Sequence, residues 1–485
     1  MTMLSSNNLI YTYKIKIMGE NMQKLFDEVT SLDKKCYQQY KLSEDILMEH
    51  AANGINVFIR DTFKTGSKII IACGSGNNGA DGLALARLLH KDYRVEIFYV
   101  KEPKSAMAKL QLDRAHAIGV HSTIELNKCD VLVDALYGTG FSRDFDYESK
   151  AVMQTINKLQ AYKIACDIPS GIKINGECDK DTFKADITLT MGALKKSMFT
   201  DTAKEFVGKV RVIDLGVTRE IYEEESNWKL LDMDDLELPF RDLQNTHKGT
   251  FGHLAILGGN KVGASMLSGL SALKFGTGLV TMVSDHEPYN MPYSMMHATS
   301  KPINTTALAL GMGLGVEFDP AKLHLFLDNP FALIADADIF HMKIIVKIIQ
   351  RKDVVITPHP KEFIALLKRT QIADITIEEL QNNRFMYAEK FCRKYPNATL
   401  LLKGANVIIG QNDMFYINAY GTSALAKGGS GDVLSGLIGS LLAQGYLPLQ
   451  AAINASLSHT KLMQNYEGAD FSLTPEDLIH GIGNL

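Results

Sequence analysis

The sequence predicts an α/β protein of two domains, each a mainly parallel sheet between layers of helices. The chain has 485 residues, which exceeds one hydrophobic core at about 100 to 200 residues per domain. Short apolar runs rich in β-branched residues alternate with helical patterns, and their continuous hydrophobicity is typical of strands buried on both faces. Residues 218–247 interrupt this alternation with an acidic run and Trp228, so we expect a boundary near residue 230.

The apolar runs place the strands of both sheets. In the first half we expect strands at residues 68–73, 95–100, 129–136, 163–168, 185–190 and 209–216. In the second half we expect strands at residues 253–259, 279–284, 307–315, 331–338, 354–360 and 399–410, and helices at 263–275, 431–444 and 449–466. Because ligands bind at the carboxyl ends of strands in open α/β sheets, each half should carry its own site.

The composition excludes several classes of partner. Lys and Arg number 51 against 55 Asp and Glu, and a net charge of -4 offers no basic surface for nucleic acid. No apolar run approaches the roughly 20 residues of a membrane-spanning helix. The six cysteines include no CxxC pair, and the N-terminus lacks the features of a secretory signal. We expect a cytoplasmic protein without nucleic acid or membrane partners, and a disordered extension at residues 1–21.

A glycine-rich loop precedes a predicted helix near the C-terminus. In AKGGSGDVLSG, residues 426–436, the glycines allow a tight turn, and the helix that follows points its first N–H groups at the loop. This arrangement is typical of a phosphate site. A carboxylate repels phosphate, so Asp432 is better suited to take a proton from a substrate hydroxyl during phosphoryl transfer. Taken alone, the pattern also fits a helix N-cap in a glycine turn.

The motifs around this loop narrow the choice. In order they are HKGTFGHLAILGGNKVGA (247–264), GMGLG (311–315), DAD (336–338), TPHPKEF (357–363), LKGANV (402–407) and GTSALAKGGSGDVLSG (421–436). Together they resemble the ribokinase-like αβα fold and, more narrowly, the NAD(P)H-hydrate dehydratases that depend on ADP or ATP. A vitamin or sugar kinase of the same superfamily would share the last motif but not the first.

The resemblance implies a reaction and its residues. The hydrate NAD(P)HX has added water to its nicotinamide ring, and phosphorylation makes the new hydroxyl a good leaving group. Asp432 would activate this hydroxyl, while Mg²⁺ would bridge the phosphates of the donor, which the resemblance favours as ADP. The substrate contacts would be Ala264, Gly313, His359 and Asp432, and the nucleotide contacts would be Lys403, Gly404, Ala405, Asn406, Val407 and Gly431.

Some of these positions depart from the family pattern. Asn406 and Val407 stand where the family commonly has glycine and threonine, and Met312 stands where proline is usual. His359, between two prolines, also fits a structural turn histidine. The glycine loop around Asp432 is intact.

A second glycine loop follows the first predicted strand, in GSGNNGADGLALAR at residues 74–87. G-x-G-x-x-G can be read from Gly74 to Gly79, but the acidic ribose partner about 20 residues on would be Glu96, inside a predicted strand. The paired asparagines and Asp81 instead supply amide and carboxylate oxygens, which suit a hard cation and sugar hydroxyls. The loop therefore differs from a dinucleotide fingerprint.

This loop belongs to a second set of motifs: LDKKCYQQYKLSEDILMEHAANGI (32–55), GNNGADG (76–82), VDALYGTGFSRD (133–144) and CDIPSG (166–171). Together they resemble the NAD(P)H-hydrate epimerases, which have a Rossmann-like three-layer αβα fold. The resemblance implies K⁺ ligands at Asn78, Asp134 and Ser170. It also implies hydrate contacts at Asn77, Asn78, Gly79, Ala80, Asp81, Gly138, Thr139, Gly140, Phe141, Ser142, Arg143, Asp144 and Asp167.

Asp167 is the expected acid/base of this site. Moving a proton at the hydroxyl of the hydrated carbon opens it to an iminium that water can recapture on the other face, which exchanges R and S. Asp134 and Asp167 each end a predicted strand, where a carboxylate can also serve only as a loop cap. Ala80 stands where the family usually has a third glycine, and we expect only a slight adjustment of the backbone.

The two resemblances together predict a bifunctional NAD(P)H-hydrate repair enzyme. Residues 22–225 would form the epimerase (isomerase) domain, 226–244 a linker, and 245–485 the ADP-dependent dehydratase (lyase) domain. The second domain would convert S-NAD(P)HX to NAD(P)H and release AMP and phosphate. The expected partners are NADHX or NADPHX, ADP, and further copies of the chain in a homo-oligomer. Two alternatives stay open: a small-molecule kinase with a regulatory nucleotide-binding domain, and a dinucleotide-binding protein without catalysis.

Overall fold

The structure is a computed structural model that describes residues 22–315, 317–327 and 331–485. The predicted disordered extension at residues 1–21 lies outside the described residues. Among the helices that are described, none combines the length and the apolar character needed to cross a membrane.

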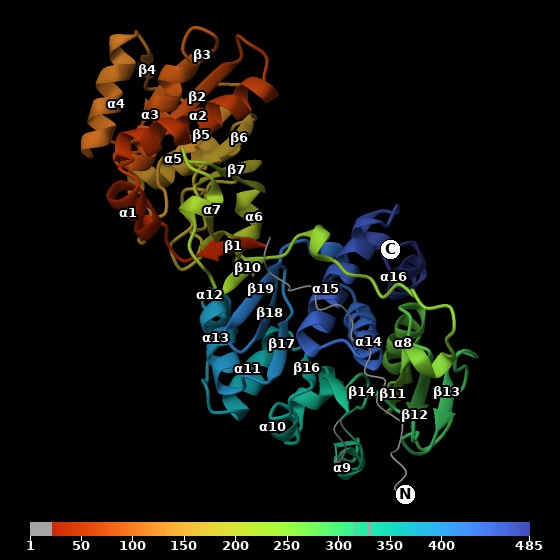
Figure 1. Cartoon of the computed structure of the whole chain (residues 1–485). Coiled ribbons are helices and arrows are strands. Elements are labelled where there is room, and N and C mark those ends of the chain that lie inside the picture. The colour runs from red at the N-terminus through yellow and green to blue at the C-terminus, as the bar shows by residue number, and fades with distance from the viewer. Residues whose placement is uncertain (1–21, 316, 328–330) are drawn as a thin grey trace, which may run out of the picture. The chain divides into compact units, whose positions relative to one another are not determined.

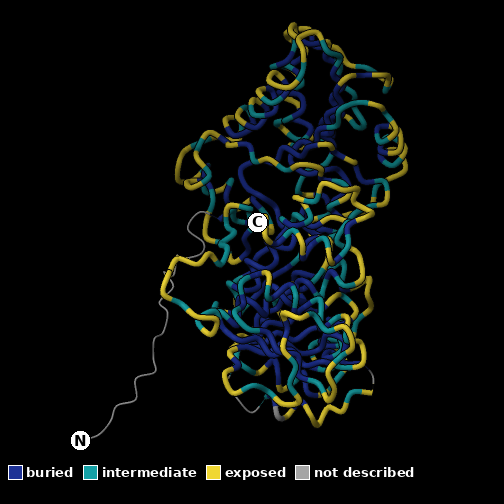
Figure 2. The backbone as a smooth tube through the Cα atoms, turned by 90° about the vertical axis from the view of Figure 1, so that its right-hand side faces the viewer, coloured by how far each residue is buried: buried dark blue, intermediate teal, exposed yellow. Residues whose placement is uncertain are grey.

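Two compact units make up the chain. The first comprises residues 24–228 with 381–384, and the second comprises residues 229–380 with 385–485. Each unit contains a mainly parallel sheet with helices packed against it (Figure 1), and the strands of both sheets are largely buried (Figure 2). The predicted α/β class is therefore confirmed.

The strand order of the first unit determines where a ligand can bind. Its strands lie in the order β4-β3-β2-β5-β6-β7-β9, and each neighbouring pair is parallel. The order changes direction between β2 and β5, and ligands of open parallel sheets bind at the carboxyl ends of such a pair. The strands are β2 (Lys68–Cys73), β3 (Arg94–Tyr99), β4 (His121–Thr123), β5 (Val131–Ala135), β6 (Tyr162–Cys166), β7 (Ile187–Met191) and β9 (Lys209–Ile213).

Alternate side chains of these strands face two separate cores. Ile69 and Ile71 of β2 pack with helices α2 and α3, whereas Ile70 and Ala72 pack with helix α5. Burial on both sides explains why the run is apolar at every position. The other elements of the unit are β1 (Gln23–Phe26), β8 (Leu194–Lys195), α1 (Thr30–Gln39), α2 (Glu44–Thr62), α3 (Asn77–Leu89), α4 (Ala106–Ala117), α5 (Tyr147–Lys158), α6 (Lys204–Val207) and α7 (Arg219–Tyr222).

The second unit has a sheet in the order β13-β12-β11-β14-β15-β16-β17-β18-β19. Its strands are parallel from β13 to β17 and antiparallel from β17 to β19. The prediction of one strand at residues 399–410 is wrong, because the turn at residues 403–406 folds this segment into β17 and β18. The strands are β11 (His253–Leu257), β12 (Leu279–Val283), β13 (Met296–Ala298), β14 (Ala307–Leu310), β15 (Ala332–Ala335), β16 (Val354–Ile356), β17 (Ala398–Leu402), β18 (Val407–Gln411) and β19 (Met414–Asn418), and β10 (Trp228–Leu230) stands at the boundary of the units.

Helix α14 lies within the second unit (Figure 1) and is buried along most of its length. It packs closely on helix α8, since a Cβ at Gly436 would lie 1.9 Å from the Ser271 hydroxyl oxygen. Glycine at this position therefore allows the two helices to touch. The helices are α8 (Val262–Lys274), α9 (Ala321–Leu327), α10 (Ile345–Ile348), α11 (Pro360–Arg369), α12 (Ile377–Asn382), α13 (Arg384–Lys394), α14 (Ser430–Ala443), α15 (Pro448–Gln464) and α16 (Pro475–Gly481).

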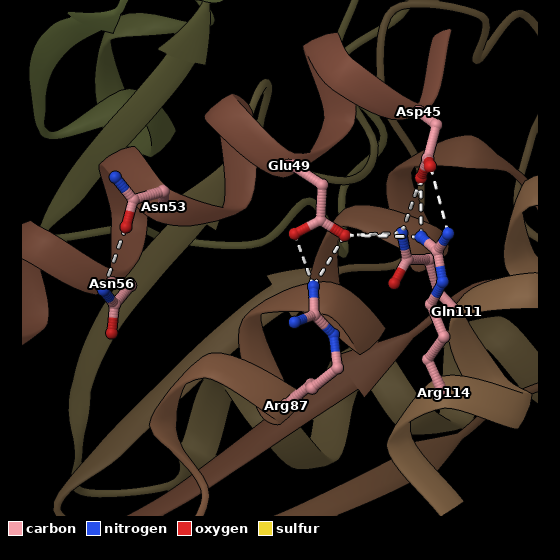
Figure 3. Close-up of polar contacts among 7 residues, drawn as sticks. All are labelled: Asp45, Glu49, Asn53, Asn56, Arg87, Gln111 and Arg114. Carbon is pink, nitrogen blue, oxygen red and sulfur yellow. Dashed lines mark hydrogen bonds and ion pairs between the residues drawn. The ribbon is translucent and has the colours of Figure 1, made fainter. Parts of the chain in front are cut away.

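A polar cluster ties helices α2, α3 and α4 of the first unit together, as Figure 3 shows. Arg114 of α4 donates two hydrogen bonds to Asp45 of α2, at 2.6 and 3.0 Å. Arg87 of α3 and Gln111 of α4 both donate to the Oε1 atom of Glu49, at 2.6 and 3.1 Å. The hydrogen bonds from Arg114 hold the pKa of Asp45 below its usual range.

Replacing Asp45 is expected to loosen helix α2 at neutral pH but not in acid. A carboxyl group whose pKa is lowered by folding stabilises the folded state above its unfolded pKa of about 3.9. That contribution is lost as the pH falls through the lower pKa of the folded state. Because the ion pair is partly exposed, we expect Asp45→Asn to cost roughly 0.5 kcal/mol at neutral pH. Hydrogen exchange of α2 and α4 amides in the full chain measures this change.

The matched control is Asp61→Asn at the other end of α2, where the carboxylate forms no ion pair with any described residue. It should leave the exchange of α4 unchanged. An equal effect of both variants, or an effect of Asp45→Asn that persists in strong acid, would contradict the role of the Asp45–Arg114 pair.

Candidate active sites

A cavity of about 750 Å³ opens in the first unit at the carboxyl ends of its central strands. The loops after β2 and β5 line one part of it, and helices α1 and α2 line another. The predicted hydrate contacts that line this cavity are Asn77, Asn78, Asp81, Gly138, Thr139, Gly140, Phe141, Ser142, Arg143 and Asp167. The structure thus brings three motifs that are distant in sequence to one place.

Three of the predicted hydrate contacts, Gly79, Ala80 and Asp144, do not line the cavity. Gly79 and Ala80 are buried in the first turn of α3. A Cβ at Gly79 would lie 1.9 Å from the carbonyl oxygen of Gly74, so the turn requires glycine there. Ala80 packs in a small apolar cluster, which accommodates its methyl group. Asp144 forms an ion pair with Lys173 at 2.9 Å.

Asp167 follows β6 and turns its carboxylate toward the cavity. Its backbone φ is 71°, a left-handed value that is uncommon outside glycine and that clusters at functional sites. Its Oδ1 atom accepts hydrogen bonds from Lys195 Nζ at 2.5 Å and from the Met191 N–H at 3.1 Å. A Cβ atom added at Gly138 would lie 3.4 Å from the Oδ2 atom of Asp167. Glycine at position 138 therefore leaves this oxygen accessible from the cavity. The bond from Met191 is also one that a loop cap would make.

Two further carboxyl groups line the same cavity, Asp33 from α1 and Asp81 from α3. Burial and, after it, the charge of Asp167 raise the pKa of Asp81 well above its usual range. Burial also raises the pKa of Asp33, although the Tyr222 hydroxyl donates a hydrogen bond to it at 2.8 Å. Strongly raised pKa values in a cleft are typical of acid/base sites.

Asp33, Tyr222 and Lys195 belong to this site but were not predicted from the sequence. Asp33 lies in the opening segment of the epimerase motifs, but no single residue of that segment stood out. Lys195 follows the apolar stretch TMGAL, and a lysine in a buried run is the signal of a buried ion pair. Tyr222 carries no such signal.

The predicted K⁺ ligands are Asn78, Asp134 and Ser170. Asp134 is fully buried, burial raises its pKa to about 6, and it accepts hydrogen bonds from the Ser170 N–H at 2.8 Å and hydroxyl at 2.7 Å. These bonds are also those of a loop cap. Both polar atoms of the Asn78 amide are buried without a hydrogen-bond partner in the described structure. Amide, carboxylate and hydroxyl oxygens fit a hard cation, and the unpartnered Asn78 oxygen gives it a place.

In the second unit, the glycine loop opens helix α14. Gly429 has a φ of 89°, so a side chain there would be strained. Asp432 lies in the first turn of α14, where no side chain caps the helix, so Asp432 does not act as an N-cap. Burial and, after it, the charge of Asp336 raise the pKa of Asp432 to about 6. This carboxyl group can therefore accept a proton near neutral pH.

Asp336, directly after β15, connects the parts of this site. It is almost fully buried and accepts hydrogen bonds from Lys403 Nζ at 2.6 Å and from the Ser435 hydroxyl at 2.7 Å. A Cβ at Gly431 would lie 3.4 Å from Lys403 Nζ. The predicted nucleotide contacts Lys403 and Gly431 are therefore neighbours beside Asp432. The DAD motif held Asp336, but sequence analysis gave it no role.

The other predicted nucleotide contacts form the turn between β17 and β18. Gly404 and Ala405 are exposed, whereas Asn406 is buried and Val407 begins β18. The turn therefore offers backbone groups and Lys403 to a ligand, and the Asn406 side chain, which replaces the family's glycine, is held inside the fold.

His359 precedes helix α11 and caps it. Its Nδ1 atom accepts hydrogen bonds from the N–H groups of Lys361 and Glu362, at 3.1 and 3.2 Å. These bonds match the predicted alternative of a structural turn histidine. Burial and, after it, the charge of Lys403 lower the pKa of His359, so the ring is neutral and its proton is on Nε2. Burial raises the pKa of Glu362 to about 7.

Helix α8 connects the remaining predicted contacts, Ala264 and Gly313. Gly313 has a φ of 72°, and a Cβ there would lie 2.2 Å from a backbone carbonyl oxygen before α8. The Ser265 hydroxyl donates at 2.8 Å to the carbonyl group preceding Gly313, and the Ser268 hydroxyl donates at 2.8 Å to that of Asp432. The first turns of α8, which carry Ala264, are therefore hydrogen-bonded to the backbone of both the Gly313 turn and Asp432.

Comparisons with known proteins identify the family of the chain. A family model described as NAD(P)H-hydrate dehydratase matches residues 254–482, and one described as the N-terminus of YjeF-related proteins matches residues 44–197. The bifunctional NAD(P)H-hydrate repair enzyme Nnr of Helicobacter pylori is 42% identical over 474 residues, which cover 96% of this chain and 100% of that protein. The enzyme of the same name from Escherichia coli is 28% identical and covers 85% of this chain and 83% of its own length.

Solved structures are also similar to the second half. The ADP/ATP-dependent NAD(P)H-hydrate dehydratase from Bacillus subtilis, co-crystallised with ATP and Mg²⁺, is 27% identical with a TM-score of 0.44, covering 51% of this chain and 92% of its own. The match to the Helicobacter pylori enzyme, in contrast, extends over both units. The chain therefore belongs to the family of bifunctional NAD(P)H-hydrate repair enzymes.

Proposed function

We propose that the chain restores NADH and NADPH from their hydrates in two steps. The first unit exchanges R- and S-NAD(P)HX, and the second dehydrates S-NAD(P)HX with ADP, which gives NAD(P)H, AMP and phosphate. The observation that carries the proposal is the 42% identity over the whole length of a repair enzyme with both activities. We assign epimerisation to residues 22–225 and dehydration to residues 245–485, with residues 226–244 as the linker.

In the epimerase site, Asp167 is the proposed acid/base. The hydrated carbon bears a hydroxyl group and a bond to the ring nitrogen. When the carboxyl group of Asp167 gives a proton to this hydroxyl, the C–O bond breaks, water leaves and the ring nitrogen and carbon form an iminium. Water that adds to the other face gives the opposite epimer. The open Oδ2 atom of Asp167 and its position on the cavity wall support this role.

We propose that Asn78, Asp134 and Ser170 hold a K⁺ ion at this site. A bound cation would supply positive charge that attracts oxygen atoms of the hydrate. The unpartnered amide of Asn78 supports the assignment. The residues that line the cavity would place the nicotinamide ring against Asp167.

In the dehydratase site, Asp432 takes the proton of the hydroxyl group as the phosphoryl group is transferred to it. The N–H groups from Gly429 to Gly431 and the ammonium group of Lys403 stabilise the charge of the transferred group. The ring nitrogen then expels phosphate, and loss of a ring proton restores the dihydropyridine. The raised pKa of Asp432 and its position beside Lys403 support this mechanism.

We propose that Mg²⁺ accompanies the nucleotide at this site, where it would neutralise phosphate charge. The carboxylate of Asp338 is partly exposed and accepts the Gly315 N–H at 2.8 Å through one oxygen. Its other oxygen is available to the ion. The homo-oligomeric state and the cytoplasmic location stay predictions, and light scattering of the purified chain tests the first of them.

Asp432→Asn is expected to abolish dehydration of both epimers while epimerisation continues. The amide cannot accept the hydroxyl proton, so the rate should fall by roughly 10²- to 10⁴-fold. The return of dihydronicotinamide absorbance with S-NADHX and either ADP or ATP measures the loss and identifies the donor. Asp413→Asn, in the exposed turn between β18 and β19, is the control. If Asp432→Asn retained the wild-type rate, Asp432 would not be the base.

Asp167→Asn is expected to impair only the conversion of the R epimer. S-NADHX should still be dehydrated at the wild-type rate. The rate at which R-NADHX is consumed should fall to that of its slow spontaneous epimerisation. Chiral chromatography of the hydrates during the reaction distinguishes the two. Asp113→Asn on the exposed face of α4 is the matched control. Equal rates for both epimers in Asp167→Asn would refute the assignment.

Dehydration is expected to become faster as the pH rises through about 6. Below its pKa of about 6 Asp432 is protonated and cannot accept the hydroxyl proton. The measurement is kcat/KM for S-NADHX at saturating nucleotide. Asp432→Glu should move the midpoint, which separates the titration of this residue from that of the nucleotide. A flat profile between about pH 5 and pH 7 would argue against Asp432.

A further inference from the structure

Lys195 ends strand β8 and is fully buried behind Asp167. Its Nζ atom donates to the Oδ1 atom of Asp167 at 2.5 Å, to the Thr190 hydroxyl at 2.9 Å and to the Met191 carbonyl oxygen at 2.7 Å. An ammonium group has three N–H donors, and these acceptors engage all of them. The head group is therefore fixed in one position.

The contacts to the Asp167 carboxylate are one-sided. Hydrogen bonds from Lys195, from the Met191 N–H at 3.1 Å and from the Thr190 hydroxyl at 3.3 Å all end on Oδ1. No hydrogen bond from a described residue reaches Oδ2, the atom that faces Gly138. The protein thus holds one oxygen of the carboxylate and leaves the other to the cavity.

Asp167 and Met191 line the cavity, but Lys195 is not among its lining residues. We propose that Lys195 is a positioning residue for epimerisation: its ammonium group holds Oδ1 of Asp167 and thereby aims Oδ2 at the hydroxyl of the hydrate. This proposal rests on the epimerase function proposed for the same cavity. Lys195 acts through Asp167, without touching the substrate.

The surrounding charges support this role. Burying an ammonium group costs free energy, which its hydrogen bonds to acceptors offset. A buried lysine directly behind the acid therefore points to a role in the site. The carboxyl groups of Asp81 and Asp33 share the cavity with Asp167. Burial raises the pKa values of both groups, and the charge of Lys195 partly offsets this effect. The lysine thus places a buried positive charge near the carboxyl groups of this cavity.

Lys195→Met tests the proposal because it removes the ammonium group and keeps much of the side-chain volume. In the full chain we expect kcat for R-NADHX to fall roughly 100-fold while KM changes less than about twofold. The chain's own dehydratase site reports each epimerisation as returning dihydronicotinamide absorbance. Ethylammonium added to Lys195→Ala is expected to restore part of kcat in a saturable manner.

The matched control is Lys196→Met, the same change at the next residue. Lys196 is also largely buried, but it pairs with Asp27 at 2.8 Å and lies 4.7 Å from the Trp228 ring centroid. Its kcat should equal that of the wild type. An equal loss in both variants would mean that any buried lysine of this segment supports the fold, and would overturn the positioning role.

Further outcomes separate the proposal from the function on which it rests. A wild-type chain that does not epimerise the hydrate would overturn the epimerase function itself. With an active wild type, a folded Lys195→Met variant of unchanged kcat would overturn the positioning role alone. If that variant does not fold, Thr190→Val tests the positioning role instead. It removes one hydroxyl group that is hydrogen-bonded to both Lys195 and Asp167. A kcat loss of roughly tenfold at constant KM supports the role, and an unchanged kcat overturns it.

Discussion

An ion pair between a lysine and a buried aspartate stands at the carboxyl end of the sheet in each unit, and each candidate site is built around it. Lys195 meets Asp167 at 2.5 Å in the first unit, and Lys403 meets Asp336 at 2.6 Å in the second. A buried charge is tolerated when an opposite charge and hydrogen bonds compensate it. In the first unit the paired carboxylate is the proposed acid/base. In the second the paired lysine is the proposed nucleotide contact, and the proposed acid/base is the separate carboxyl group of Asp432.

This difference follows the chemistry of the two steps. Proton transfer to the hydroxyl that leaves and from the water that adds needs a carboxyl group in a fixed position, and the one-sided hydrogen bonds of Asp167 provide that. Phosphoryl transfer needs positive charge near the phosphate and a base that keeps away from it. In the proposed mechanism Lys403 of the second unit therefore acts on the phosphate, while burial raises the pKa of Asp432 to about 6. The same kind of ion pair thus serves two reactions.

The sequence was most informative where a site is local. The loop around Asp432 and the loop around Asn78 each combine a turn, a helix start and a polar side chain in a few residues, so their chemistry could be predicted. Lys195 and Asp33 could not be found in this way, because only the folding of β8 brings Lys195 to Asp167 and only the folding of α1 brings Asp33 to the cavity. Asp336 had no assigned role because its partners, Lys403 and Ser435, come from distant segments.

The fold shows the same limit. The buried strands were predictable because a parallel sheet with helices on both faces requires a continuous apolar run, as in β2. Residues 399–410 are equally apolar at both ends, and only the pairing of β17 with β18 shows that the polar turn between them reverses the chain. Met312, which stands where proline is usual in the predicted motif, is fully buried in a turn and packs in the core of the second unit.

The stereochemistry of the hydrate explains why the two sites differ in form. Dehydration needs the phosphoryl donor in line with a hydroxyl group on one face of the ring, and Asp432 is held on one side by helix α14 and its bond to Ser268. An epimerase must instead meet a hydroxyl group on either face. Its cavity is lined by Asp33, Asp81 and Asp167 from three different segments, so carboxyl groups face the cavity from more than one part of the fold. A site with its acid on one side selects one epimer, and a site with carboxyl groups on several sides can interconvert the epimers. A chain that carries both sites can therefore use both the R and the S hydrate.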